Sequence, residues 1–308
     1  MAAKWGPMWL VRIVAIPLLL LANLPPAFAR EDPESQSKRL PEVYLVGVIH
    51  NMHFESKSNY SLIDLQEQII SIHPDVICGE IAPEAFDQPM EGYFPPEAAF
   101  LAAMASTWKI RFVPVDWRVS YILQKKAEAE EPSSIANRVA QLDNDFISGI
   151  KNFKGVSIYD YFHDPEVLSL VDTKFEQIIG ENTVSDLAAG NWHERNRHIV
   201  EIGLSEAKAA KRIVFVFGAS HLPQLVRQLK SRGIEAKILP RRFTPSDNQQ
   251  LSNQVMARWQ RNLDNLKAIR DGKIVVSTDD AQKVRNSHRI QDLEQALQAT
   301  TIRAHSPF

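Results

Sequence analysis

The stretch Val43-Tyr-Leu-Val-Gly-Val-Ile-His50 is a short apolar run that ends on a histidine, and the expected fold follows from it. A similar stretch, Arg212-Ile-Val-Phe-Val-Phe-Gly-Ala-Ser-His221, lies about half a chain later. Both runs are rich in β-branched and aromatic residues, both end on Gly-x-x-His, and a helical pattern follows each of them. This order is typical of the first strand of a βα unit.

The two strand-end histidines, His50 and His221, are the strongest functional signal in the chain. In open α/β sheets, ligands bind beyond the carboxyl ends of the strands. Two similar units would bring both imidazoles to that edge of the sheet. We therefore expect His50 and His221 to face one shared crevice, which is the predicted functional site.

Further strands and helices follow in alternation. After a polar loop, Ser61 is predicted to cap a helix that His73-Pro74 ends. The apolar run Val76-Ile-Cys-Gly-Glu80 is typical of a second, buried strand, and the strand–helix–strand order predicts a parallel pair. A third strand is predicted at 110–115 and ends on the polar residues Asp116-Trp117-Arg118.

These elements predict a single α/β domain over residues 41–308. Two βαβ units, at 43–80 and 212–239, would form a mainly parallel central sheet with helices over both faces. A helical insertion is expected between them, at about 120–205. The tail, 241–308, shows two helical patterns, 247–270 and 288–299, and no site chemistry, so it is predicted to cover the sheet.

The N-terminal segment is predicted to be a signal peptide, residues 1–29. Lys4 and Arg12 flank the start of an apolar run, and Ala27-Phe28-Ala29 has the small-x-small pattern of a cleavage site. The apolar run is shorter than the roughly 20 residues of a membrane span. We expect an exported, periplasmic or secreted protein with a polar lead-in at 30–40; a retained N-terminal anchor is the alternative.

Composition narrows the class of partner. The 308 residues include 35 basic and 37 acidic side chains, so the basic footprint of a nucleic-acid-binding protein is missing. A peptide or a small molecule is the expected substrate. The single cysteine, Cys78, excludes an internal disulfide and is predicted to be a buried apolar residue.

His50, His221 and Glu80 form the predicted core of the site. Neutral imidazole is a common metal ligand and also a general base suited to neutral pH. Glu80 ends an apolar strand, so its carboxylate must face the crevice or be paired. Two histidines and a carboxylate suit a zinc- or manganese-type divalent ion, which activates water. The alternatives are histidines bonded to backbone and a Glu80 ion pair with Arg195 or Arg118.

Four further side chains are secondary candidates or supports. Arg195 and Arg197 have the guanidinium fork that clamps a carboxylate or stabilises an oxyanion, and one of the two is expected to be solvated instead. Asp116 has three possible roles, as a metal ligand, as a partner of Arg118, or in orienting a histidine, which we favour. His53 is either a further metal ligand or a solvent-exposed residue, and exposure is favoured.

The other histidines are weaker candidates. His198 lies four residues after Glu194 on one predicted helix face, so it is expected either to pair with Glu194 or to reach the site. Surface positions are predicted for the histidines outside the motifs: His73, His163, His288 and His305.

Taken together, Gly47-x-x-His50, Glu80, the helical Glu194-Arg195-Asn196-Arg197 and Gly218-x-x-His221 resemble the superfamily that contains TraB, GumN and Tiki proteins. Erythromycin esterases and haem-binding uptake lipoproteins are its more distant relatives. The order and spacing match from about residue 43 to 240. The tail beyond this region has no counterpart in the family pattern.

The resemblance implies three functions. Tiki-type proteins are regarded as metal-dependent peptidases, which implies that His50, His221 and Glu80 hold the ion and that Arg195 stabilises developing charge. The uptake lipoproteins imply haem binding through the histidines. The erythromycin esterases imply hydrolysis without metal, with His50 as general base and Glu80 activating water.

Overall fold

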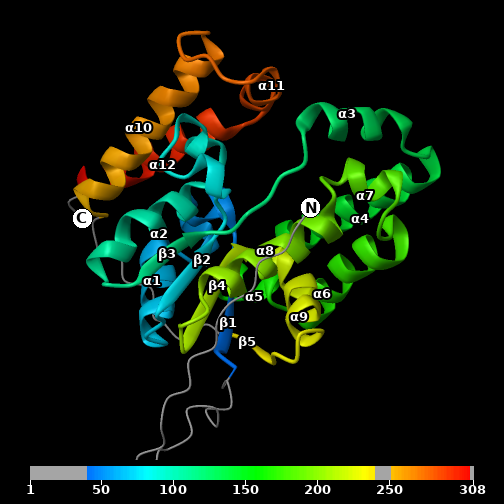
Figure 1. Cartoon of the computed structure of the whole chain (residues 1–308), viewed down its shortest axis with the longest axis horizontal. Coiled ribbons are helices and arrows are strands. Elements are labelled where there is room, and N and C mark those ends of the chain that lie inside the picture. Colours follow the sequence, from blue (N-terminus) through cyan, green and yellow to red (C-terminus); the bar gives the residue numbers. More distant parts are fainter. Residues whose placement is uncertain (1–39, 240–250, 306–308) are drawn as a thin grey trace, which may run out of the picture. The chain divides into compact units, whose positions relative to one another are not determined.

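The computed structural model describes residues 40–239 and 251–305 of the chain. In this part of the chain, five parallel strands form one sheet in the order β3-β2-β4-β1-β5 (Figure 1). The strands are β1 (Glu42–Val48), β2 (Val76–Gly79), β3 (Arg111–Pro114), β4 (Arg212–Gly218) and β5 (Ala236–Ile238). The predicted α/β class and parallel sheet are confirmed.

The two βαβ units interlock. β4 lies between β1 and β2, and β1 lies between β4 and β5, so the strands of one unit are parallel but are not neighbours. Val48 at the end of β1 is paired with Gly218 at the end of β4. The two Gly-x-x-His segments therefore leave the sheet side by side, at its carboxyl edge.

Helices account for most of the remaining described residues (Figure 1). They are α1 (Leu62–Ser71), α2 (Pro96–Thr107), α3 (Tyr121–Glu130), α4 (Ser133–Asn152), α5 (Ile158–Phe162), α6 (Pro165–Asp172), α7 (Val184–Ala188), α8 (Trp192–Glu206), α9 (Leu222–Lys230), α10 (Asn253–Arg270), α11 (Thr278–Asn286) and α12 (Arg289–His305). Short 3-10 helices are η2 (His50–Phe54), η3 (Ser56–Ser58), η4 (Pro83–Ala85), η5 (Pro89–Tyr93) and η7 (Ala219–His221), and Thr173–Ile179 (η6) is a π-helix.

Local sequence signals account for several of these boundaries. Ser61 and Asp64 form a capping box at the start of α1, in which the Ser61 backbone N–H donates to Asp64 Oδ2 at 2.6 Å. The polar segment predicted as a loop after His50 instead contains η2 and η3. The insertion predicted at about 120–205 corresponds to α3 through α8.

Alternate residues of the central strands pack on opposite faces of the sheet. Val46, Val48 and Val214 belong to a core that also contains residues of α1, α2, α10 and α12. Leu45 and Phe215 belong to a second core, which α8 and α9 complete. Helices therefore cover both faces of the sheet, as predicted.

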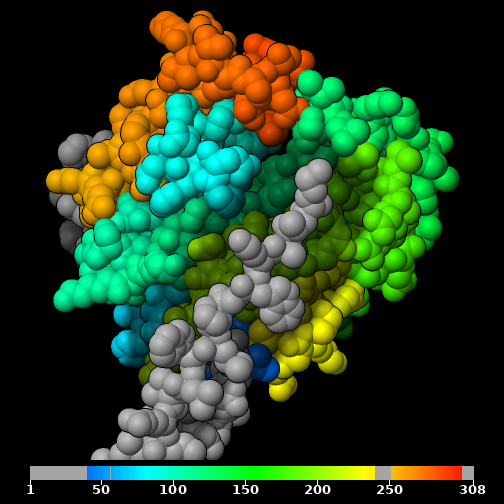
Figure 2. All heavy atoms as spheres, in the orientation of Figure 1, coloured from blue at the N-terminus to red at the C-terminus, as the bar shows by residue number. Residues whose placement is uncertain are grey.

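The tail packs on α2 and on the proline-rich segment before it. Trp259 of α10 is fully buried, and its Nε1 donates to the carbonyl of Pro96 at 2.8 Å. In Figure 2, α10 and α11 (orange) lie against the segment that contains η4 and η5 (cyan), where Asn262 Nδ2 donates to Glu91 at 2.8 Å. α11 lies between the two helical patterns predicted for the tail and matches neither of them.

The predicted signal peptide at 1–29 and most of the lead-in lie outside the described residues. Among the helices that the structure describes, none is long and apolar enough to cross a membrane. The described residues, from Leu40 onward, form one compact unit.

Candidate functional site

His50 stands directly beyond β1, where the chain turns into η2. Its φ of +51° lies in the left-handed region, which histidine, asparagine and aspartate adopt more readily than other side chains do. The turn brings Nδ1 of the imidazole to 2.6 Å from Oε1 of Glu97, in the first turn of α2. The carboxylate accepts the Nδ1 proton, which leaves Nε2 for other chemistry.

Charges around this pair set its protonation. Burial disfavours the charged imidazole, but the carboxylate of Glu97, and at longer range that of Glu80, outweigh burial and raise the pKa of His50 above its ordinary value. Burial similarly opposes ionisation of Glu97, and His50 outweighs it, so the pKa of Glu97 is lowered. The carboxylate of Glu97 thus makes the His50 imidazole a stronger base than a free imidazole.

Glu80, the residue after β2, is the centre of a second cluster. Its Oε1 accepts from Nη2 of Arg195 at 2.9 Å and from Nη2 of Arg118 at 3.2 Å, and its Oε2 accepts from the backbone N–H of Gly218 at 3.0 Å. Asp116 holds the same two guanidinium groups, through Arg195 Nε at 2.7 Å and Arg118 Nε at 2.7 Å. The ion pair that was the alternative for Glu80 is present.

Both carboxylates of this cluster are ionised. Burial opposes the charge on Glu80, but His50 and then Arg195 lower its pKa to about 2. Burial also opposes the charge on Asp116, and Arg118 and Arg195 together lower the pKa of that carboxyl. Two cations and two anions cancel, which allows the cluster to be buried behind the site.

His221 is held as a neutral ring by Asn196 of α8. Asn196 uses Nδ2 to donate to the carbonyl of Trp192 at 2.8 Å, so its Oδ1 must accept from His221 Nδ1, at 2.7 Å. The ring also stacks on Trp192, with centroids 4.2 Å apart. Burial, and then Arg195, hold the pKa of His221 well below its ordinary value. Its Nε2 therefore carries a lone pair.

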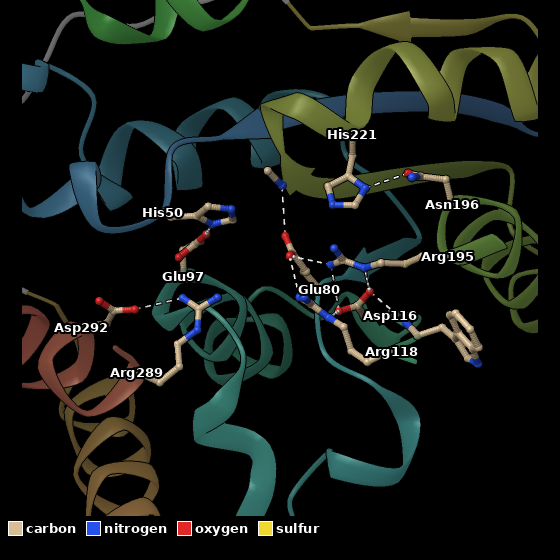
Figure 3. Close-up of polar contacts among 12 residues, drawn as sticks. His50, Glu80, Glu97, Asp116, Arg118, Arg195, Asn196, His221, Arg289 and Asp292 are labelled. Carbon is tan, nitrogen blue, oxygen red and sulfur yellow. Dashed lines mark hydrogen bonds and ion pairs between the residues drawn. The ribbon is translucent and has the colours of Figure 1, made fainter. Parts of the chain in front are cut away.

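Figure 3 shows that the predicted residues His50, Glu80, Arg195 and His221 come from four different elements and gather at the carboxyl edge of the sheet. The secondary candidates Asp116 and Arg118 join them. Asp116 binds the two arginines and no histidine, so the favoured prediction that it orients a histidine is wrong.

Two predicted candidates, Arg197 and His53, make no hydrogen bond to this group among the described residues, although His53 lies close enough to Glu97 to affect its pKa. Arg197 is paired with Glu194 and Glu181 on the partly exposed side of α8. His53 is buried, and it accepts from the backbone N–H of Ile49 at 3.3 Å while its Nδ1 contacts the carbonyl of Tyr60 at 3.1 Å. The favoured solvent exposure of His53 is wrong: it ties η2 to the following loop.

Two of the remaining histidines, His198 and His163, lie in different surroundings. His198 lies 2.9 Å from Glu194, which confirms the predicted pair. His163, predicted on the surface, is only partly exposed: it stacks on Tyr159 with centroids 3.6 Å apart, and its buried Nε2 has no hydrogen-bond partner in the structure. Its position follows from the close approach of α5 to the end of β1, which no local pattern shows.

Sequence reasoning missed three polar side chains of the site, Glu97, Asn196 and Arg289. Glu97 follows Pro95-Pro96 at a helix start, where a carboxylate normally serves as a solvated N-terminal charge. Asn196 lies within the arginine motif, where no local pattern indicates that its side chain would contact a histidine. Arg289 belongs to the tail, where no site chemistry was expected. Its charge acts to lower the pKa of His50, against the larger effect of Glu97.

Comparison of the chain with known protein families, with curated proteins and with solved structures finds no match. The resemblance to TraB, GumN and Tiki proteins therefore stays a prediction. What the site does must be argued from its own geometry and charges.

The predicted ligand set does not suit a divalent metal ion. Both oxygens of Glu80 already accept hydrogen bonds, and two guanidinium cations flank the carboxylate. Within residues 40–239 and 251–305, no group of three or more His, Cys, Asp or Glu side chains is arranged to hold a metal.

Zinc- or manganese-type binding and haem binding both remain sequence-based predictions.

Gly218 has no side chain, and this leaves space for the imidazole ring of His50. A Cβ at this position would lie 2.6 Å from Nε2 and 3.0 Å from Cε1 of His50. We expect Gly218→Ala to push the imidazole away from Glu97 and to lower kcat/KM by about 10²-fold, as a misplacement near 1 Å can do. Steady-state kinetics of the folded variant measure this effect.

Gly233→Ala is the matched control. A Cβ there meets no atom within 4 Å, but the φ of +75° strains an alanine. This variant should lose about 1 kcal/mol of stability and keep its kcat/KM. If Gly218→Ala is as active as the wild type, the close approach of His50 to Gly218 is unimportant for activity.

Proposed function

We propose that the chain is an exported hydrolase that works without a metal ion and uses His50 as its general base. The observation that carries the proposal is the 2.6 Å contact between His50 Nδ1 and the buried carboxylate of Glu97. A carboxylate in this position fixes the tautomer of an imidazole and stabilises the imidazolium that forms during proton transfer.

In the proposed reaction, Nε2 of His50 accepts a proton from a water molecule while the water oxygen attacks the carbonyl carbon of an ester or amide. The resulting imidazolium then gives that proton to the leaving group as the carbon–heteroatom bond breaks. Arg118 has no hydrogen-bond partner for Nη1 among the described residues, so this donor is the one suited to the developing oxyanion.

The opposite pKa shifts of the two histidines support separate roles. His50, with its raised pKa, is a base of useful strength, whereas His221 is too weak a base to deprotonate water near neutral pH. The lone pair on His221 Nε2 accepts a hydrogen bond from the attacking water and orients it. Glu80 holds Arg195 and Arg118 in place and does not act on water itself.

Two features of the sequence are consistent with this proposal. The predicted signal peptide supports export, and the resemblance to the erythromycin-esterase branch favours hydrolysis without metal. Because no related protein was found, the scissile bond is proposed only as an ester or amide of a small molecule or peptide.

The test is hydrolysis by the chain from residue 30 onward, with 4-nitrophenyl esters and peptide 4-nitroanilides as substrates. Activity should survive dialysis against EDTA and 1,10-phenanthroline, and the dialysed protein should be free of metal by mass spectrometry. Activity that disappears on chelation and returns with zinc or manganese would restore the metal-dependent prediction and overturn this one.

Glu97→Gln should change the pH dependence of the reaction. The base form of His50 is the active one, so the rate rises with pH through the pKa of His50, which Glu97 raises. Without that carboxylate the pKa falls, so the acidic limb of the kcat/KM profile should move to lower pH. The plateau should drop by about tenfold or more, because the imidazolium loses its partner.

Glu91→Gln provides a control for the loss of a buried carboxylate. Glu91 is equally buried but binds Arg258 and Asn262. This variant is expected to be less stable and to keep the wild-type pH profile. If the acidic limb of the kcat/KM profile of Glu97→Gln lies at the same pH as that of the wild type, His50 is not the base.

A further inference from the structure

Arg289 brings a cation from the C-terminal tail to the site. It is the first residue of α12, and its Nη1 donates to Oδ2 of Asp292 at 3.0 Å. Asp292 also accepts a hydrogen bond from Nδ2 of Asn51, the residue that follows His50. The start of α12 is therefore held directly against the turn that carries His50.

The guanidinium of Arg289 extends from α12 toward the His50–Glu97 pair, and Arg118 lies on the other side of the site (Figure 3). Within the described part of the chain, Asp292 is the only hydrogen-bond partner shown for Arg289, through Nη1. Nε and Nη2 thus remain as donors, and Arg118 retains Nη1 in the same way.

The basic and the acidic side chains of this site differ in their exposure to solvent. The groups that solvent reaches are basic, with side-chain exposures of 39% for His50, 26% for Arg118 and 22% for Arg289. The carboxylates are buried, at 5% for Glu80, 2% for Glu97, 0% for Asp116 and 9% for Asp292. The accessible rim therefore presents positive charge, although the cluster as a whole is close to neutral.

A rim of this kind attracts and orients anions, and a guanidinium edge matches the planar, two-oxygen geometry of a carboxylate. We propose that Arg289 binds a carboxylate of the substrate, while Nη1 of Arg118 serves the oxyanion, so that the substrates are esters or amides that carry a carboxylate near the scissile bond. This inference rests on the proposed hydrolase function. According to this inference, α12 supplies the residue that selects the substrate.

The test compares two six-carbon esters, 4-nitrophenyl hexanoate and the mono-4-nitrophenyl ester of adipic acid, which differ in a terminal carboxylate. The wild type should prefer the adipate ester. Arg289→Met should lower the preference, the ratio of the two kcat/KM values, by about tenfold or more. Arg289→Lys should retain part of it, because the charge remains and the fork is lost.

Arg285→Met is the matched control. Arg285 is an exposed arginine at the end of α11, four residues earlier, and no ion pair is shown for it. This variant should keep the wild-type preference. Circular dichroism checks the folding of each variant, and Arg289→Gln replaces Arg289→Met if the latter does not fold.

Binding of adipate, measured by calorimetry, separates this inference from the hydrolase proposal. If the wild type hydrolyses neither ester, the hydrolase proposal fails, and adipate binding that is weakened in Arg289→Met still supports the carboxylate site. If Arg289→Met keeps both the wild-type preference and the wild-type affinity for adipate, the carboxylate site is wrong, whether or not hydrolysis depends on His50.

Discussion

His50→Asn should lower kcat/KM by about 10²- to 10⁴-fold, the range that a general base contributes. The variant loses Nε2, which is the proposed proton acceptor, and breaks the contact with Glu97. Asparagine is the replacement of choice because it tolerates the left-handed backbone of this position, at a φ of +51°. The substitution therefore adds no backbone strain, and thermal unfolding measures what the loss of the Glu97 contact costs in stability.

The chain offers a closely matched control in His73→Asn. His73 is exposed, has a φ of +45°, and lies between α1 and β2, where the sheet presents its amino edge. The same substitution in nearly the same backbone conformation should leave the rate unchanged. If both variants hydrolyse ester at the wild-type rate, His50 is not the base and the proposed function is lost with it.

Asp116→Ala should destabilise the protein by about 3–5 kcal/mol, the usual cost of breaking a buried ion pair from one side. The Asp116 carboxylate is fully buried and binds Arg195 Nε, Arg118 Nε and the backbone N–H of Trp117. Its removal leaves two guanidinium groups with Glu80 as their remaining carboxylate. Urea unfolding at neutral pH measures the change in the free energy of unfolding.

Glu294→Ala is the comparison at the surface. Glu294 pairs with Lys267 at 2.7 Å, and both side chains are exposed. Solvent screens such a pair, so its loss should cost less than about 1 kcal/mol. If Asp116→Ala lowers the free energy of unfolding by no more than this, the buried cluster does not stabilise the fold.

The same cluster should make the wild type sensitive to acid. A carboxyl whose pKa is depressed in the folded state contributes stability above its ordinary pKa and loses it as the pH falls. For Glu80 that window runs from its reference value of 4.5 down to about 2. Urea midpoints should therefore fall across this range, and Asp116, whose pKa is also lowered, should add to the fall in the wild type but not in Asp116→Ala.

Local patterns were sufficient for much of the fold. The apolar runs at 43–48 and 212–217 are strands, Ser61 caps α1, and the tail forms α10 and α12 close to the predicted positions. Each of these signals operates over a few residues, through hydrophobic period, capping or a break at proline. The strand order was not predicted, because it depends on which strands of the two units pair with one another.

The amino-acid sequence by itself determined that His50 and His221 stand at the carboxyl ends of parallel strands, since a strand-length apolar run and the turn after it are local properties. Only the tertiary structure decided what these histidines bind. The insertion of β4 between β1 and β2 sets His50 against Gly218, and it brings the Gly218 N–H to Glu80. The packing of α2, α8 and α12 then supplies Glu97, Asn196 and Arg289. The physical reason is that hydrogen bonds and charges act through space over a few ångströms, whatever the separation of the residues along the chain.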